Sequence, residues 1–394
     1  MHALDDFRAE TRAWLEANCP PSMRTPMPED ERVWGGRNAR YKNPDSKLWL
    51  DRMAARGFTV PTWPREYGGA GLSGEEAQVL REELGRLECR QPLASFGIWM
   101  LAPVLLKYGT DAQKDEYLPK IARGEIRWCQ GYSEPGAGSD LAALKTRCED
   151  QGDHYLVNGQ KVWTSYANYA DWIFCLVRTD STVKHGGISF VLFDMTSPGV
   201  ETRPITLISG ASVFCETFFT DVRVPKENLV GQLNAGWTIA KELLQHERGM
   251  IAEIGRTIGG TVPPVDVVAQ HYLGDAQGRI TDPVLRDAVA RQVMNDRAFA
   301  LTIRRAEQES ETGAGTGGAS SMFKYYGTEQ NKARFELILK CAGSAALGWD
   351  SAEFSAQELD ICRTWLRSKG NSIEGGTSEV QLNVIAKRVL GLPD

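Results

Sequence analysis

The sequence predicts a multidomain α+β protein with an all-α N-terminal domain, a middle antiparallel β domain of barrel or sandwich type, and a C-terminal domain like a four-helix bundle. Apolar residues recur at helical spacing up to about residue 125, alternate with a period of two from there to about 232, and then return to helical spacing. A chain of 394 residues is also longer than one ordinary core supports. We therefore expect domains at 1–125, 126–232 and 233–394.

The N-terminal block is predicted to be helical, with a loop in its Pro/Gly-rich passage at 60–71. Residues 94–108 are apolar nearly all round, which indicates a helix buried on every side. The other candidate helices of this block cover 7–17, 46–56, 75–86 and 111–121.

In the middle block, Asn158-Gly159 stands between two short alternating runs, at 154–157 and 161–164. This dipeptide is the strongest short hairpin signal, so we expect a tight turn there. Further strands are expected at 172–178, 188–193 and 212–219.

The C-terminal block is predicted to be helical again, apart from an irregular stretch at 259–282. The expected helices cover 236–256, 283–309 and 320–347, and a last one follows Gly375-Gly376.

The composition argues against several classes of protein. The net charge is −6 without an extended basic run, so neither nucleic acid nor an anionic membrane surface is an expected partner. Eight cysteines without a C-x-x-C pair and only 5 histidines predict no metal site. No stretch approaches the ~20 apolar residues of a membrane span. The first residues lack the pattern of a secretory signal, and we expect a cytoplasmic protein with reduced thiols.

Glu247 interrupts an apolar stripe. It lies four residues after Leu243 and four before Ile251, so a helix would direct it toward the buried side. A carboxylate against apolar surface is a stronger proton acceptor than a solvated one. The alternative is a partly exposed carboxylate paired with Arg248 or His246.

Two glycine-rich segments and one aromatic segment are candidate cofactor contacts. Residues 128–140 contain Pro135, Gly136 and Gly138 beside Ser139, a composition that suits a diphosphate but also an ordinary turn. In 371–386, two glycines precede Thr377, which would cap a helix whose first N–H groups bind an anion, or simply cap it. Trp163-Thr164-Ser165 could flank a flat heterocycle, although a tryptophan at a strand end is more often core.

These segments stand in the order and spacing found in the acyl-CoA dehydrogenases, which the chain resembles from near residue 5 to residue 393. The resemblance implies a flavoprotein that binds FAD non-covalently, usually as a homotetramer, although a dimer is also possible. It also implies an acyl-CoA substrate and an electron-transfer flavoprotein as the acceptor. The segments that carry it are Trp63–Gly71, Lys107–Pro119, Ser133–Asp140, Asn158–Thr164 with Ala170-Asp171, and Glu374–Glu379.

Carried over position by position, the resemblance places ten residues at the flavin. Ser139 would also reach the CoA moiety. Arg248 is expected to position the substrate or the base-bearing loop. The flavin contacts would be Gln130, Tyr132, Ser133, Gly138, Ser139, Trp163, Thr164, Ser165, Thr377 and Glu379.

The catalytic base departs from the commonest family pattern. Many members carry it in a Tyr-Glu-Gly-Thr loop, where this chain has Gly375 at the glutamate position and Glu374 beside it. Members similar to the isovaleryl and long-chain enzymes take the base from the helix after the β domain, in a Glu-Arg pair like Glu247-Arg248. We therefore expect Glu247 to be the base, with Glu374 as second choice. The 258–282 stretch also lacks the family's usual flavin-contact segment, so no partner-subunit residue is assigned.

The resulting expectation is FAD-dependent α,β-dehydrogenation of an acyl-CoA to its trans-2-enoyl form, with hydride transfer to flavin N5. Alternatives with the same fold are an acyl-CoA oxidase or a flavin monooxygenase that uses O₂, or a non-catalytic partner subunit. Small residues near the base suggest room for a branched, long or polycyclic acyl group.

Overall fold

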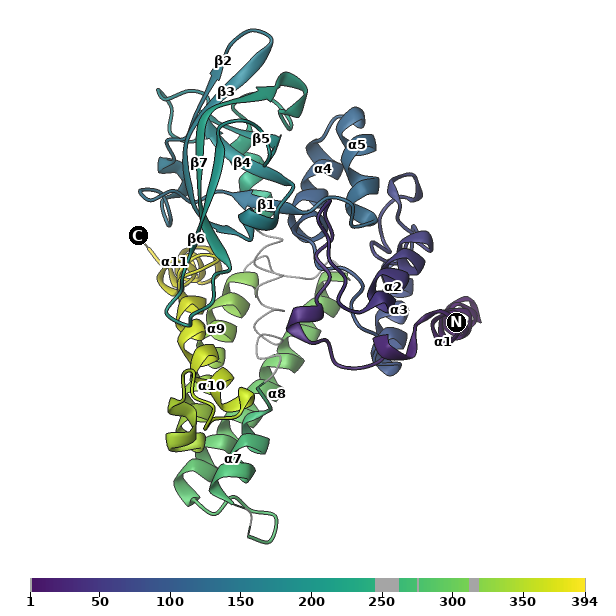
Figure 1. Ribbon diagram of the computed structural model, residues 1–394, viewed down its shortest axis with the longest axis vertical. Coiled ribbons are helices and arrows are strands. Elements are labelled where there is room, and N and C mark those ends of the chain that lie inside the picture. The colour runs from purple at the N-terminus through teal and green to yellow at the C-terminus, as the bar shows by residue number, and fades with distance from the viewer. Residues whose placement is uncertain (1, 245–261, 275, 312–318, 394) are drawn as a thin grey trace. The chain divides into compact units, whose positions relative to one another are not determined.

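The computed structural model describes residues 2–244, 262–274, 276–311 and 319–393 (Figure 1). It divides into two compact units, Met1–Ile205 with Val213–Leu243, and Thr206–Ser212 with Leu244–Asp394. The helical, β, helical order expected from the sequence is confirmed. The three-domain limits remain a prediction.

The N-terminal helices form where the periodicity places them, and two of them begin with a capping box. In α3, Ser73 accepts from the N–H of Glu76 while the Glu76 carboxylate accepts from the N–H of Ser73; Thr110 and Gln113 do the same at α5. The apolar run at 94–108 forms a π-helical turn, Gly97–Leu101, that continues into α4, Ala102–Tyr108. The remaining bounds are α1 His2–Asn18, α2 Pro44–Ala55, α3 Gly74–Arg86 and α5 Asp111–Ala122.

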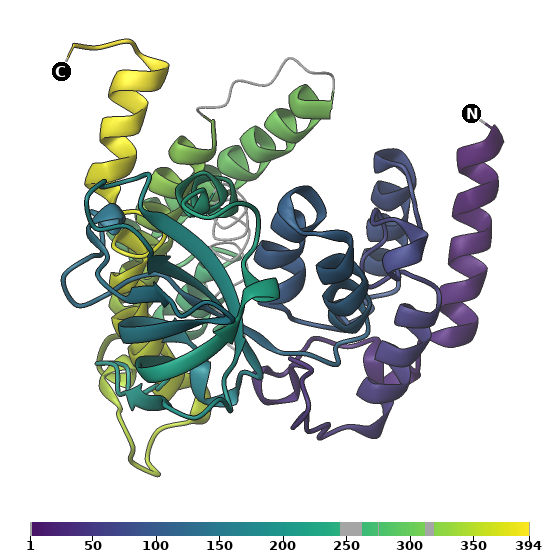
Figure 2. The same cartoon turned by 90° about the horizontal axis from the view of Figure 1, so that it is seen from above.

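The middle segment folds into one seven-stranded sheet in the order β1-β4-β2-β3-β7-β6, with β5 paired to β4. The sheet is mainly antiparallel, as expected, but β1 runs parallel to β4. Seen from above, the long strands are strongly twisted (Figure 2). The strands are β1 Trp128–Gly131, β2 Arg147–Asp150, β3 His154–Ser165, β4 Trp172–Arg178, β5 Ile188–Asp194, β6 Val200–Ile205 and β7 Phe214–Pro225.

The expected hairpin at Asn158-Gly159 is wrong. Both residues lie inside the continuous strand β3, at a bulge where the register with β7 shifts. At the bulge, the Asn158 side chain binds Asp221 of β7. Its Nδ2 donates to Oδ1 of Asp221 at 3.0 Å, and its Oδ1 accepts from the N–H of Asp221 at 2.9 Å. The turn between β2 and β3 instead lies at 151–153, where Gly152 has φ +90°. Pairing with β2 and β7 therefore overrides the local turn preference of Asn-Gly.

The N-terminal helices and the sheet belong to the same unit and contact each other directly. Nε2 of Gln113 on α5 donates to the carbonyls of Glu227 and Leu229, at 2.7 and 2.9 Å. Tyr117, also on α5, makes edge contacts with Trp128 of β1 and with Trp172 of β4. These contacts attach the helices to the β1 and β4 side of the sheet (Figure 1).

The second unit is helical and includes two helices that the sequence analysis missed. One is α7, Val265–Leu273, within the stretch expected to be irregular; the other is α10, Ala356–Ser368, which begins with a capping box of Ser355 and Glu358. The apolar core of the second unit includes Val268, Phe335, Ile338 and Ile361. The other helices are α8 Pro283–Glu311, α9 Ala319–Ala342 and α11 Ser378–Val384.

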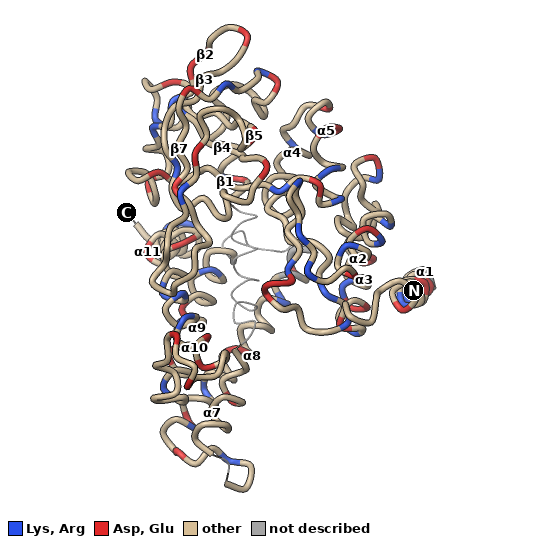
Figure 3. The backbone as a smooth tube through the Cα atoms, viewed as in Figure 1, with Lys and Arg blue, Asp and Glu red and all other residues tan. Residues whose placement is uncertain are grey.

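Charged residues of both signs are interspersed along the tube (Figure 3). Within the described ranges, no helix has the length and apolar character that crossing a membrane requires. The same ranges contain no group of three or more His, Cys, Asp or Glu placed to hold a metal ion.

Candidate active site

The segment that follows β1 forms a tight turn closed by its own backbone. The N–H of Glu134 donates to the carbonyl of Ala137 and the N–H of Ala137 donates back, both at 3.0 Å. Gly138 and Ser139 are exposed just beyond this turn, and Gln130 and Ser133 are half-buried before it. A Cβ added at Gly138 would meet no atom within 4 Å, so a ligand could approach the backbone there.

A buried ion pair supports this turn, and its two residues are not among those expected at the site. Lys161 of β3 is fully buried, and its Nζ lies 2.8 Å from Oε1 of Glu134 and 3.1 Å from the carbonyl of Tyr132. Glu134 also accepts from the N–H groups of Lys145 and Thr146, at 2.6 and 2.9 Å. Burial alone would raise the pKa of Glu134, but the charge and hydrogen bond of Lys161 and the two N–H donors lower it. The alternation of β3 places Lys161 on a buried face, which was the available signal.

The end of β3 carries the aromatic segment in an unusual conformation. The register with β7 shifts between Lys161 and Thr164, and Trp163 has φ +60°, which is strained for a bulky residue. The Trp163 ring is 54% exposed and makes a T-shaped contact with Phe214. Ser165 is half-buried beside it. The bulge also joins the β1 turn, because the N–H of Val162 donates to the carbonyl of Ser133 at 2.9 Å. The structure thus brings Ser133 and the 163–165 segment together.

Thr164 lies in the same bulge but points inward. Its side chain is fully buried, and its Oγ1 has no hydrogen-bond partner in the part of the chain that the structure describes. The flavin contact expected of Thr164 therefore stays a prediction.

In the second unit, the glycine-rich loop before α11 is held by ion pairs and amide contacts. Gly375 and Gly376 adopt φ +63° and +87°, a conformation that favours glycine. Oγ1 of Thr377 accepts from the N–H of Val380 at 3.2 Å, so the expected cap of α11 is confirmed; anion binding by its first N–H groups stays a prediction. Glu379 is exposed in the first turn, where its own backbone N–H and the Thr377 hydroxyl lower its pKa.

Glu374, the second choice for the base, is engaged in a structural network. Nη1 and Nη2 of Arg367 donate to its two carboxylate oxygens, at 3.2 and 2.8 Å. Nδ2 of Asn371 donates to Oε1 of the same carboxylate at 2.6 Å. Three hydrogen bonds, two of them from a guanidinium, therefore hold this carboxylate in place.

Glu247 and Arg248 lie outside the described residues. Residues 236–244 of the same segment are helical, and Ala240 and Leu243 of the expected apolar stripe are fully buried. On the same helix, Glu242 pairs with Lys107 at 2.7 Å and accepts from the Tyr108 hydroxyl at 2.6 Å.

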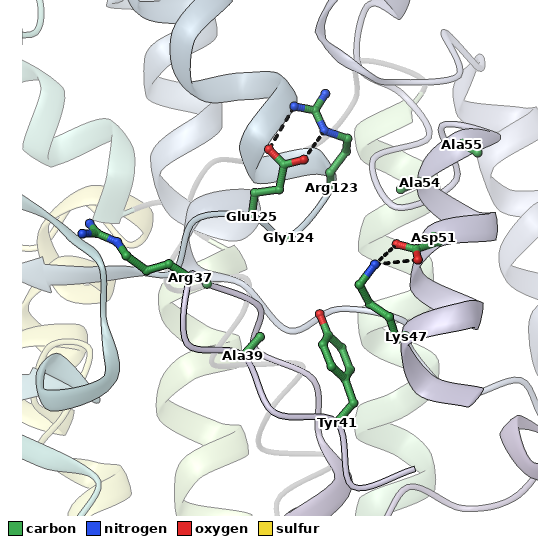
Figure 4. A pocket seen from close by; sticks show the side chains of 11 residues that line it. Arg37, Ala39, Tyr41, Lys47, Asp51, Ala54, Ala55, Arg123, Gly124 and Glu125 are labelled. Carbon is green, nitrogen blue, oxygen red and sulfur yellow. Dashed lines mark hydrogen bonds and ion pairs between the residues drawn. The ribbon is translucent and has the colours of Figure 1, made fainter. Parts of the chain in front are cut away.

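A cavity of about 430 Å³ lies elsewhere in the first unit, between the loop at 36–41, α2 and the end of α5 (Figure 4). Its charged groups are all paired: Lys47 with Asp51 at 2.5 Å, Arg123 with Glu125 at 2.7 Å, and Arg37 with Asp194 outside the cavity at 2.6 Å. None of the residues expected at the site lines it, and we assign it no role in the chemistry. A smaller hollow of about 290 Å³ lies beside the β1 turn, lined in part by Glu134 and Gly136.

The residues present fit the flavin that the resemblance implies. The β1 turn offers open space over Gly136 and Gly138. The neighbouring bulge offers the exposed ring of Trp163 and the half-buried Ser165. An exposed aromatic face and hydroxyl groups suit a flat heterocycle with polar edges.

Comparisons with known proteins show the family of the chain. Three acyl-CoA dehydrogenase family models match the chain. The N-terminal domain model matches residues 3–125, the middle domain model matches 129–222, and the C-terminal domain model matches 234–390. The acyl-CoA dehydrogenase IpdE1 of Mycobacterium tuberculosis is 33% identical over 398 residues, covering 100% of this chain and 99% of that protein.

Solved structures give the same result. The Tcur3481-Tcur3483 steroid ACAD has a TM-score of 0.78 and 31% identity, and the match covers 100% of this chain and 98% of that chain. The ChsE4-ChsE5 complex from Mycobacterium tuberculosis has a TM-score of 0.77 and 31% identity, with the same coverage of 100% and 98%.

Proposed function

Because the chain belongs to the acyl-CoA dehydrogenase family, and is thus an oxidoreductase acting on acyl-CoA, we propose that it catalyses FAD-dependent α,β-dehydrogenation to the trans-2-enoyl-CoA with Glu247 as the base. The observation that carries the choice of base is the network around Glu374, whose carboxylate accepts from Arg367 at 2.8 and 3.2 Å and from Asn371 at 2.6 Å. That network favours Glu247, and so does the burial of Ala240 and Leu243 in the described residues that precede it.

The chain's own groups would lower the barrier in two ways. The α C–H of a thioester is a weak acid, so Glu247 needs a desolvated setting that strengthens it as a base. Backbone N–H groups at the thioester carbonyl would stabilise the negative charge that develops as the proton leaves. Arg248 would position the substrate, and Ser139 would hold the CoA moiety.

FAD, when bound, supplies an acceptor at N5 for the hydride that leaves the β carbon. Gln130, Tyr132, Ser133, Gly138 and Ser139 would hold it from the β1 turn. The bulge and the loop before α11 would complete the contacts, through Trp163, Thr164, Ser165, Thr377 and Glu379.

For the substrate, we propose a bulky acyl group, such as a steroid-derived one. The support is the likeness to the Tcur3481-Tcur3483 steroid ACAD, at a TM-score of 0.78, and the small residues next to Glu247 in the sequence. We also propose that the protein works as an oligomer and passes electrons to an electron-transfer flavoprotein.

The decisive experiment compares Glu247→Gln with Glu374→Gln. Both proteins are loaded with FAD and assayed on a series of acyl-CoA thioesters with an artificial electron acceptor. Removing a general base costs roughly 10²–10⁴-fold in rate, so Glu247→Gln should keep its flavin and lose activity by about that factor. Glu374→Gln should retain most of its activity per bound FAD.

Reversed results would transfer the base to Glu374. Hydrogen peroxide formation by the wild-type protein without an added acceptor would indicate an oxidase instead. Absence of turnover with every thioester would favour a non-catalytic subunit.

A further inference from the structure

Lys324 on α9 is a fully buried cation whose hydrogen-bond acceptor is a backbone carbonyl. Its side chain has no exposed surface, and its Nζ donates to the carbonyl of Asn371 at 3.1 Å. No ion pair with a carboxylate is found for it among the described residues, although ammonium groups are seldom fully buried unless paired. Burial lowers the pKa of Lys324, while the charges of Glu374 and Glu329 act in the opposite direction.

Asn371, the residue that Lys324 contacts, opens the glycine-rich loop before α11. Its side chain is held from α9 as well, because Nδ2 of Asn331 donates to its Oδ1 at 2.7 Å. Its own Nδ2 donates to Glu374 at 2.6 Å. One buried residue therefore receives two hydrogen bonds from α9 and donates one to the carboxylate that Arg367 also binds.

The rest of the loop is tied to the same helix at two further points. Nζ of Lys332 donates to Oγ of Ser372 at 3.1 Å and pairs with Glu329 at 3.0 Å. Oγ of Ser378 donates to Glu329 at 2.9 Å. Between these two anchors stand Gly375 and Gly376, which place no side-chain restraint on the loop.

We propose that Lys324 is a positioning residue for the cofactor: by holding the carbonyl of Asn371, it fixes the 371–377 loop in the conformation that contacts FAD. This inference rests on the proposed function, which assigns Thr377 and Glu379 to the flavin. Two consecutive glycines leave the loop many alternative conformations, so an internal anchor is needed to select one. A buried positive charge next to the loop also favours an anionic ligand on it.

A packing role alone would give a different result. If Lys324 only stabilised the helical unit, its loss would lower the unfolding temperature of the apoprotein and leave the affinity of the folded protein for FAD unchanged. Affinity for FAD, measured on protein whose folded fraction is known, therefore separates the two roles.

The experiment removes the ammonium group in Lys324→Met and compares it with Lys340→Met, which deletes an exposed charge from the same helix. Circular dichroism gives the folded fraction, and flavin fluorescence quenching gives the Kd for FAD. Loss of a charged hydrogen bond should weaken FAD binding roughly tenfold or more in Lys324→Met, whereas Lys340→Met should stay within about twofold of wild type. Lys324→Arg, which keeps a charge and a donor, should recover part of the affinity.

Asn331→Ala decides the question if Lys324→Met does not fold, because it removes the other bond from α9 to Asn371 and should weaken FAD binding in the same direction. Thr377→Val tests the proposed site itself. Unchanged FAD affinity in folded Lys324→Met, with weakened binding in Thr377→Val, would overturn the positioning role alone. Unchanged affinity in both would overturn the assignment of this loop to the cofactor.

Discussion

Lys161 and Glu134 form a buried ion pair, with Nζ 2.8 Å from Oε1, that joins β3 to the turn after β1. The Lys161 side chain has no exposed surface and that of Glu134 is only 8% exposed. Because that turn carries Ser133 and Ser139, the pair connects the stability of the β core to the geometry of the candidate flavin contacts.

Lys161→Met should therefore be strongly destabilising. Removing one partner leaves the other charge buried without compensation, which costs about 3–5 kcal/mol. The apparent free energy of unfolding from urea melts measures the effect. As a control, Lys184→Met removes an exposed partner of Asp140 and should cost less than about 1 kcal/mol. The double variant Lys161→Met with Glu134→Gln should be more stable than Lys161→Met alone; if it is not, the ion pair is not the cause.

Acid should loosen the contact between α1 and α3 through Glu83. The hydrogen bond from Arg12 is the largest influence that lowers the pKa of Glu83, to about 2, with further help from Arg86 and Arg8 against the opposing effect of burial. A lowered pKa means that the stabilisation is complete above the unfolded value of about 4.3 and is lost as the pH falls toward the folded value. Unfolding midpoints of wild type and Glu83→Gln should differ by a constant amount above about pH 5 and converge below it. A difference that persists undiminished at about pH 2.5 would contradict this assignment.

Gly159→Ala should destabilise the β3 bulge. An added Cβ would lie 2.6 Å from Oγ1 and 2.7 Å from Cα of Thr146, so the backbone that leads into β2 must shift. Overpacking of this kind costs about 1–3 kcal/mol. Gly85→Ala on α3 is the matched control, because a Cβ there meets nothing within 4 Å and should be neutral or stabilising by about 0.5 kcal/mol. Thermal unfolding should give a lower midpoint for Gly159→Ala and an unchanged or higher midpoint for Gly85→Ala.

Ser139→Ala should raise the KM for acyl-CoA thioesters and leave kcat nearly unchanged. Ser139 is exposed beyond the β1 turn, where a hydrogen bond to the CoA moiety would contribute equally before and during the reaction. Losing one hydrogen bond should raise KM by roughly two- to tenfold. Ser181→Ala, an exposed serine with no assigned role, serves as the control. Equal KM values for both variants would remove Ser139 from the substrate site.

Local signals predict the helices best. Helix α3 follows from periodicity alone, and its capping box at Ser73 and Glu76 agrees with that start. The same signal is present at Ser355 and Glu358 before α10, a helix that the periodicity did not reveal. Helix α7 lies in the stretch expected to be irregular; Pro264 is the residue just before it, a position that proline tolerates.

The candidate site was only partly accessible from the sequence. Gly-rich turns and the Trp-Thr-Ser run could be found as local patterns, because a cofactor-binding loop needs particular residues in succession. The partners that hold them could not, since Lys161 and Glu134 are 27 residues apart and Lys324 and Asn371 are 47 apart.

By itself, the sequence determined the order of helical and β segments and, through motif order, the family, because periodicity and turn residues act over a few neighbouring positions. Only the tertiary structure decided that Asn158-Gly159 is a bulge and not a turn, and that Glu374 is bound to Arg367 and Asn371. Both depend on hydrogen bonds that form once separate elements have packed, and such pairings outweigh the preferences of any two adjacent residues.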